Sequence, residues 1–271
     1  MKVPFVWLRG ACQAALRTTV TGFGGVDYLC PNARNCEPGL SSHAVSMLAI
    51  RTRKPQYCLL LILAGTTAWC QNSAAIVPAD QALARLMNGN KRYSLNKEQH
   101  PDESLARRRE LEQGQHPLAV ILSCADSRVP PELIFDQGLG DLFVIRVAGN
   151  IAADDDLGST EYAVQHLHTK LIVVLGHEKC GAVSAAVAGA NAPGHLKALL
   201  AAIQPSVEET RHLAGDPVHN CVIANARRVA RQIRESEPVL RELIEKEAVK
   251  VVAADYALDS GIVTLLEVPH P

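Results

Sequence analysis

Three short runs of apolar residues, separated by stretches with helical spacing, constrain most strongly what this chain can fold into. The runs span residues 118–123, 142–147 and 171–175. Each is continuous rather than alternating, as expected for strands that are buried on both faces of a parallel sheet. Parallel strands need long, right-handed crossover connections, which are usually helical. We therefore predict an α/β fold with a central, mainly parallel β-sheet flanked by helices.

Local signals predict further elements around these strands. A first helix is expected from Pro78 to Gly89, because glycine often ends a helix, and Ser159 is expected to cap a helix after the second strand. Apolar residues at helical spacing predict two later helices, around residues 222–233 and 239–244. Two more apolar runs flank Asp259-Ser260-Gly261, so the fold is expected to end in an antiparallel hairpin extension.

The first 75 residues differ from the rest. Arg51-Thr-Arg-Lys54 precedes an apolar run of about a dozen residues, and Ser73-Ala-Ala75 follows it, an order typical of a secretory signal peptide. A bilayer span needs roughly 20 apolar residues. Met47 lies just before the basic segment, so we expect translation to begin there. The predicted division is a misassigned start or extension over 1–46, a signal peptide over 47–75 and the folded domain over 76–271.

This division predicts an exported protein, in the periplasm of a bacterium. The alternative is that the apolar run is a buried helix and the protein is cytoplasmic. Residues 76–271 hold 20 basic and 26 acidic residues, a net charge that argues against nucleic acid as a partner. Three of the eight cysteines remain in this part, Cys124, Cys180 and Cys221. Small domains stapled by disulfides use even numbers of cysteines, so these thiols require another role.

Two of the predicted strands end in residues that carry chemistry. The first runs into Cys124-Ala-Asp126-Ser-Arg128, and the third runs into His177-Glu-Lys-Cys180. Ligands of parallel α/β sheets bind at the carboxyl ends of the strands, so the two segments are expected to meet. Two thiolates and one imidazole suit Zn²⁺ and leave its fourth tetrahedral position open. An open position is what a catalytic zinc requires, whereas a structural zinc would have a fourth protein ligand.

These motifs resemble those of the β-class carbonic anhydrases, C-x-D-S-R and H-x-x-C. The similarity extends from about Ala82 to Gly261. It implies one Zn²⁺ per chain, held by Cys124, His177 and Cys180. It also implies that Asp126 and Arg128 form a catalytic dyad, in which Asp126 either takes the fourth position on the metal or turns away to pair with Arg128. The same resemblance assigns the substrate pocket to Gln115, Phe143, Tyr162 and Gly181.

The activity implied by the resemblance is the reversible hydration of carbon dioxide to bicarbonate and a proton. Zinc lowers the pKa of a bound water from 15.7 to about 7, and the resulting zinc-bound hydroxide attacks the carbon of CO₂. Two alternatives stay open, a hydrolase of carbonyl sulfide or carbon disulfide on the same zinc, and a non-catalytic, zinc-stabilised scaffold domain. The resemblance further implies a homodimer or a tetramer, with the active site near the subunit boundary. Because the apolar run is short and is expected to be cleaved off, no membrane span is expected in the mature protein.

Overall fold

The computed structural model describes residues 76–267, and the predicted extension and signal peptide lie outside this range. One five-stranded sheet has the order β2-β1-β3-β4-β5. Its strands are β1 (Ala119–Ser123), β2 (Leu142–Arg146), β3 (Leu171–His177), β4 (Lys250–Tyr256) and β5 (Val263–Leu266). The first four pair in parallel, and β5 pairs antiparallel with β4. The predicted α/β fold with its C-terminal hairpin is therefore confirmed.

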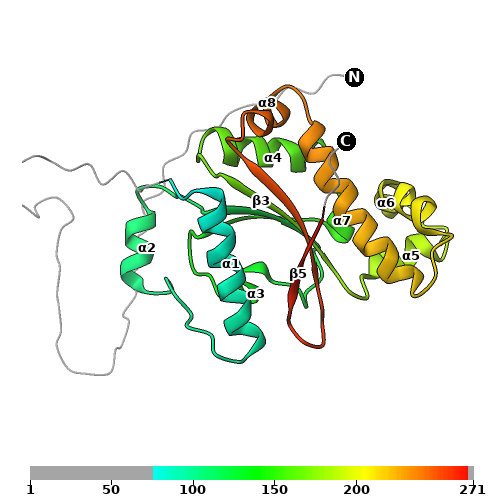
Figure 1. Cartoon of the computed structure of the whole chain (residues 1–271), viewed down its shortest axis with the longest axis horizontal. Coiled ribbons are helices and arrows are strands. Elements are labelled where there is room, and N and C mark those ends of the chain that lie inside the picture. Colours follow the sequence, from blue (N-terminus) through cyan, green and yellow to red (C-terminus); the bar gives the residue numbers. More distant parts are fainter. Residues whose placement is uncertain (1–75, 268–271) are drawn as a thin grey trace, which may run out of the picture. The chain divides into compact units, whose positions relative to one another are not determined.

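Helices cover both faces of this sheet (Figure 1). They are α1 (Ala79–Ser94), α2 (Leu105–Leu111), α3 (Pro131–Ile134), α4 (Asp154–Gln165), α5 (Gly181–Val187), α6 (Leu196–Thr210), α7 (Pro217–Glu235) and α8 (Val239–Glu245), with a short 3₁₀ turn at Ala148–Asn150. Buried residues of α4, α7 and α8 pack against one face, and those of α1 and α3 pack against the other. Helices α5 and α6 form a further apolar cluster with α7 beside the carboxyl ends of the strands.

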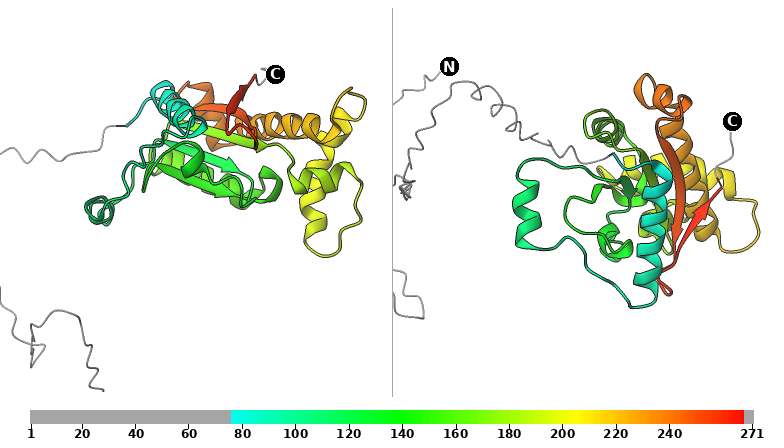
Figure 2. Two further views of the ribbon diagram at one scale, coloured as in Figure 1. Left: turned by 90° about the horizontal axis from the view of Figure 1, so that it is seen from below. Right: turned by 60° about the vertical axis from the view of Figure 1, so that its left-hand side comes forward.

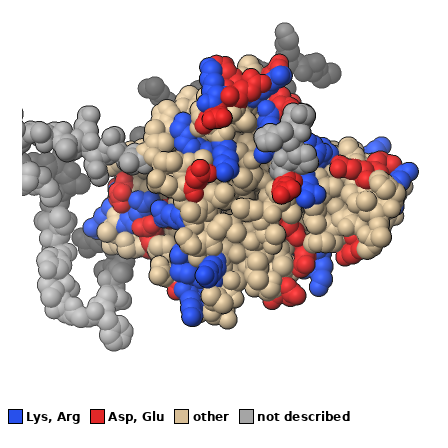
Figure 3. Space-filling model, in the orientation of Figure 1, with Lys and Arg blue, Asp and Glu red and all other residues tan. Residues whose placement is uncertain are grey.

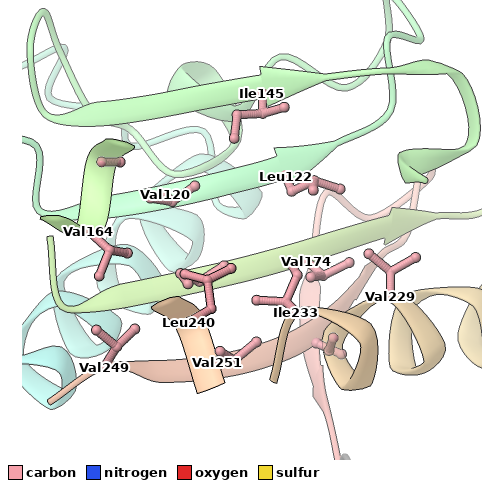
Figure 4. Close-up of a cluster of buried hydrophobic side chains, with 14 of the residues drawn as sticks. Val120, Leu122, Ile145, Val164, Val174, Val229, Ile233, Leu240, Val249 and Val251 are labelled. Carbon is pink, nitrogen blue, oxygen red and sulfur yellow. The ribbon is translucent and has the colours of Figure 1, made fainter. Parts of the chain in front are cut away.

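Alternation along the central strands explains why both faces are apolar. In β1, Val120 and Leu122 contact the α7 side, whereas Ala119 and Ile121 contact the α1 side. Figure 4 shows the first of these clusters, in which Val120 and Leu122 face side chains from the helices. A sheet covered on both faces leaves the ends of the strands as the place where polar side chains can gather.

Two of the predicted helix boundaries are wrong. Gly89 lies inside α1, which continues to Ser94. A glycine stands at this position because the helix approaches the backbone at the end of α3 closely. A Cβ at this position would come within 1.8 Å of the Phe135 carbonyl oxygen. Ser159 does not cap α4, since this helix already begins at Asp154. The Asp156 carboxylate accepts from the Ala153 backbone N–H at 2.9 Å, and it supports the helix start in place of Ser159.

Helix α2 stands apart from the two helical layers (Figure 2). None of its residues is buried in the described part of the chain. Its start is capped by Ser104, whose hydroxyl accepts from the Arg107 backbone N–H at 3.1 Å. The Arg107 side chain then donates to the Leu139 carbonyl at 3.0 Å and so ties the helix to the body. Between residues 76 and 267, no helix has the length and apolarity needed to cross a membrane.

Charges of both signs are interspersed on the face shown in Figure 3. The densest group lies over α8, where Arg241 pairs with Glu237 and Glu245 at 2.6 and 2.8 Å. Neighbouring opposite charges cancel at a distance, so this face has no continuous basic surface of the kind that would attract a polyanion.

Candidate metal centre

The sheet brings the two predicted ligand segments together at the carboxyl ends of adjacent strands. Strands β1 and β3 pair in parallel with Ser123 opposite Leu175, so Cys124 emerges beside the end of β3. The ligand atoms of Cys124, His177 and Cys180 all lie within 4.8 Å of one another, and all three residues are buried. The two sulfurs are 3.9 Å apart. The predicted convergence is therefore observed.

The buried imidazole is fixed in one tautomer. Nδ1 of His177 lies 2.9 Å from the Glu178 carbonyl oxygen; since a carbonyl only accepts, Nδ1 carries the proton and donates. Nε2 then presents a lone pair toward the sulfurs, and within residues 76–267 it has no hydrogen-bond partner. A buried polar atom without a partner costs about 1–3 kcal/mol. A metal ion bound by Nε2 would remove this cost, so the donor set fits Zn²⁺.

The contact between the two thiols shifts their pKa values in opposite directions. The Cys124 and Cys180 sulfurs are within hydrogen-bonding distance, and this contact lowers the pKa of Cys124 to about 4 despite the opposing effect of burial. The same contact, together with burial, raises the pKa of Cys180. The Gly149 backbone N–H also donates to the Cys124 sulfur, at 3.3 Å. Coordination of a metal ion requires both sulfurs as thiolates, and the lowered pKa of Cys124 favours the first of them.

Beside the cluster, Asp126 is paired with Arg128. Its Oδ1 accepts from the Arg128 backbone N–H and from Nε at 3.0 and 2.9 Å, and its Oδ2 accepts from Nη2 at 2.8 Å. These bonds hold the pKa of Asp126 well below its ordinary value and raise the pKa of Arg128. Asp126 Oδ2 is 3.9 Å from Nε2 of His177. The carboxylate thus borders the cluster while its charge is held by the guanidinium.

Sequence reasoning missed Arg146, the last residue of β2. Its Nε donates to the Cys124 carbonyl at 3.0 Å, and its Nη2 donates to the Asp126 carbonyl at 2.5 Å. Two carbonyls of the ligand loop are therefore held by one side chain from the neighbouring strand. A charged residue inside the otherwise apolar run 142–147 was the signal in the sequence that could have found it.

The predicted pocket residues fall into two groups. Gly181 directly follows Cys180 and begins α5. Gln115 precedes β1, and Phe143 pairs with Val120 near the start of that strand, about 13 Å along the strand direction from the level of Cys124. Tyr162 contacts the Phe143 ring at a centroid distance of 6.2 Å. One chain therefore does not bring Gln115, Phe143 and Tyr162 to its own cluster.

The described chain thus combines a mainly parallel sheet with a buried Cys₂His set at its carboxyl edge, bordered by an Asp–Arg pair, and this set could hold a metal ion. Comparison with known proteins places this fold and this set of residues in one family. The family model described as carbonic anhydrase matches residues 119–263. Carbonic anhydrase 2 of Mycobacterium tuberculosis is 40% identical over 180 residues, which cover 65% of this chain and 87% of the relative.

Solved structures show the same likeness. The β-carbonic anhydrase CafA of Aspergillus fumigatus has a TM-score of 0.56 and 30% identity, with 71% of this chain and 92% of that chain covered. One of two tetrameric β-carbonic anhydrases from Sordaria macrospora has a TM-score of 0.55 and 27% identity, with 59% and 85% covered. The chain belongs to the β-carbonic anhydrase family. It is therefore an enzyme of the carbonic anhydrase class, whose general activity is CO₂ hydration.

Proposed function

We propose that this chain catalyses the reversible hydration of CO₂ to bicarbonate and a proton on one Zn²⁺ per chain, held by Cys124, His177 and Cys180. The observation that carries the proposal is the unpartnered Nε2 of buried His177, which faces two sulfurs within 4.8 Å. When bound by three protein ligands, Zn²⁺ supplies hydroxide at neutral pH, because it lowers the pKa of a water to about 7.

The Asp126–Arg128 pair orients the reacting oxygen. Oδ2 of Asp126 lies close enough to the cluster to accept a hydrogen bond from an oxygen nucleophile there, which turns a lone pair of that oxygen toward CO₂. Arg128 holds both carboxylate oxygens, and it also donates to the Lys179 carbonyl at 3.2 Å. This clamp keeps Asp126 off the metal position. An Asp126 carboxylate that occupied the metal position would exclude the oxygen nucleophile, so that arrangement would be inactive.

A second copy of the chain completes the substrate pocket in this proposal. Gln115, Phe143 and Tyr162 lie toward the amino ends of the strands in their own chain, yet Tyr162 is 47% exposed and so is available to a neighbour. The Sordaria macrospora relatives are tetrameric by their printed description. In a homodimer or tetramer, Gln115 of one copy would donate to a substrate oxygen in the site of another, with the Phe143 and Tyr162 rings as apolar walls.

Zinc analysis combined with stopped-flow kinetics tests the activity. Zinc-loaded protein comprising residues 76–271 is expected to bind about one Zn²⁺ per chain and to hydrate CO₂ rapidly. A parallel assay with carbonyl sulfide separates the hydrolase alternative, which predicts faster turnover of that substrate than of CO₂. Stoichiometric zinc without turnover of either substrate would instead identify a scaffold domain.

Export to the periplasm is a separate proposal, since the segment that carries it lies outside the described residues. The basic stretch, the apolar run and the small residues before Ile76 support it. Intact mass of protein recovered from the periplasm is expected to place the N-terminus within a few residues of Ile76. Recovery of a chain that retains residues 1–46 would refute both the start and the cleavage site.

A further inference from the structure

A buried chain of hydrogen bonds connects α7 to the sulfur of Cys124. Asn225 of α7 is fully buried, and its Nδ2 donates to the Gly149 carbonyl at 2.8 Å. The N–H of the same glycine donates to Cys124 Sγ at 3.3 Å. Gly149 is thus held at its carbonyl by a helix side chain while its N–H contacts a sulfur of the cluster.

The orientation of the Asn225 amide is fixed by its other contacts. Its Oδ1 lies 3.4 Å from the Ser206 hydroxyl and 3.3 Å from Nη2 of Arg228. Arg228 is itself held, because Nη2 donates to the Ala202 carbonyl at 2.6 Å and Nε donates to Ser206 at 3.0 Å. A flipped amide would place its NH₂ group against the guanidinium, which has only donors. Nδ2 must therefore face Gly149.

The Gly149 turn depends on this support. Gly149 has a φ of 75°, in the left-handed region that favours glycine. A Cβ here would come within 2.6 Å of Ile203 Cδ1, so the turn is pressed against α6. Glycine is also the residue with the most alternative backbone conformations. A contact that holds its carbonyl thus decides where its N–H points.

We propose that Asn225 is a positioning residue for the metal centre, which keeps the Gly149 N–H on the Cys124 sulfur and thereby sets how tightly this cysteine binds the metal. The inference rests on the proposed role of Cys124 as a ligand. An N–H donated to a thiolate fixes the orientation of the sulfur toward the metal and lowers the energy of its lone pairs. Loss of the fixed orientation weakens metal binding, and the raised lone-pair energy changes the spectrum of a bound metal. Partners beyond the direct ligands typically change metal affinity by about 10–100-fold when they are removed.

Asn225→Asp tests the proposal, because aspartate has nearly the same shape and keeps an acceptor for Ser206 and Arg228 but cannot donate to Gly149. We expect the zinc dissociation constant, measured by competition with a chromogenic chelator, to rise about 10–100-fold. In the Co²⁺-substituted protein, the sulfur-to-metal charge-transfer band is expected to move to lower energy, because the thiolate has lost a hydrogen bond. A purely structural role would not move this band.

Val229→Ala is the matched control, since Val229 lies on the same helix in the cluster away from the cysteines. It is expected to lower the melting temperature with no change in zinc affinity or in the cobalt band. Equal zinc affinity and an unmoved band in Asn225→Asp would overturn the proposal. If that variant does not fold, Ser206→Ala, which removes one contact of the Asn225 Oδ1, decides. A smaller shift of the same band supports the proposal, and an unmoved band rejects it.

The proposed function is tested separately from this inference. Zinc stoichiometry of the unaltered chain and its loss in Cys124→Ser establish whether Cys124 is a ligand. If both results are as expected and Asn225→Asp still behaves as the unaltered chain does, the metal site stands and only the positioning role is rejected.

Discussion

At the residue scale, two of the three predicted ligand side chains are held by backbone groups without a metal. His177 is turned by the Glu178 carbonyl, and Cys124 receives the Gly149 N–H. Metal affinity should therefore depend on the ligands and on the groups that hold them in place, whereas turnover should depend on Asp126 and Arg128. The two properties can be separated by substitution.

The first prediction concerns this separation. Cys124→Ser, His177→Ala and Cys180→Ser are expected to lose zinc. Arg128→Ala is expected to retain zinc and to lose at least about 100-fold in turnover, because the unclamped Asp126 then competes for the metal position. Metal analysis and CO₂ hydration kinetics on the same samples check this. Turnover within a few-fold of the unaltered enzyme in Arg128→Ala would show that the Asp–Arg pair is only structural.

Cys221 has a different chemistry from the other two cysteines. It is fully buried in α7, and all three described cysteines are free. Burial raises the pKa of the Cys221 thiol to about 11, so the folded protein keeps it protonated at pH 8. We expect a chromogenic disulfide reagent to leave Cys221 unmodified in the folded, zinc-loaded protein at this pH, and to modify it after denaturation.

The raised pKa of Cys221 also predicts the direction in which the stability of the folded protein changes with pH. The unfolded thiol loses its proton at a lower pH than the folded one, so the contribution of Cys221 to stability is complete below the unfolded pKa. That contribution is lost as the pH rises toward 11. Cys221→Ala should flatten the fall in melting temperature above pH 9. An equally steep fall in the variant would show that burial of Cys221 does not control it.

At the element scale, two helical glycines have opposite roles. Gly89 of α1 lies against the Phe135 carbonyl, whereas Gly158 of α4 has nothing within 4 Å of the position of a Cβ. Alanine is favoured over glycine inside helices by about 1 kcal/mol. Gly158→Ala is therefore expected to stabilise the protein by up to about 1 kcal/mol, and Gly89→Ala to destabilise it by about 1–3 kcal/mol. Denaturant unfolding of the pair measures both, and stabilisation by Gly89→Ala would contradict the close packing of α1 on α3.

Helix α4 also carries a candidate for proton export. His166 directly follows α4, and its ring lies 5.1 Å from that of Tyr162, the proposed wall of the pocket in a second copy. An exposed imidazole there could pass the product proton to buffer. His166→Asn is expected to lower kcat at low buffer concentration, with recovery as imidazole buffer is added and with kcat/KM nearly unchanged. A kcat that is independent of buffer would exclude the relay.

The strands and the convergence of Cys124, His177 and Cys180 could be predicted from the sequence because each depends on local information. The β1 run is apolar up to its last residue, Ser123. Cys124 directly follows β1, and His177 ends β3, with Cys180 three residues further on. Gly89 was misjudged because a glycine inside a helix cannot be told from a glycine after a helix without the neighbouring α3 backbone. Ser159 was misjudged because α4 already begins at Asp154, where Asp156 supports the helix start. Arg146 and Asn225 were missed as well. Their roles arise from contacts to carbonyls that are distant in the sequence.

At the scale of the whole molecule, the metal cluster and three of the proposed pocket residues lie at opposite ends of the sheet of one chain. Helix α2, which has no buried residue in the described chain, ends at Leu111, four residues before Gln115. A helix without a core of its own gains stability by burying its apolar side chains against a partner. A dimer in which each copy completes the site of the other accounts for both observations.

Complementation between two inactive variants tests this arrangement. Gln115→Ala keeps its metal ligands but offers its partner no amide donor, whereas His177→Ala lacks a metal ligand but keeps Gln115. In a mixed dimer, the intact metal site of the first chain receives Gln115 from the second. After denaturation and joint refolding at equal amounts, about a quarter of all sites should be complete if the chains pair at random. The activity should then exceed that of the two variants refolded separately. Light scattering must show a dimer or tetramer in each sample. Joint refolding into oligomers without any gain in activity would show that Gln115 does not act in the site of a second copy.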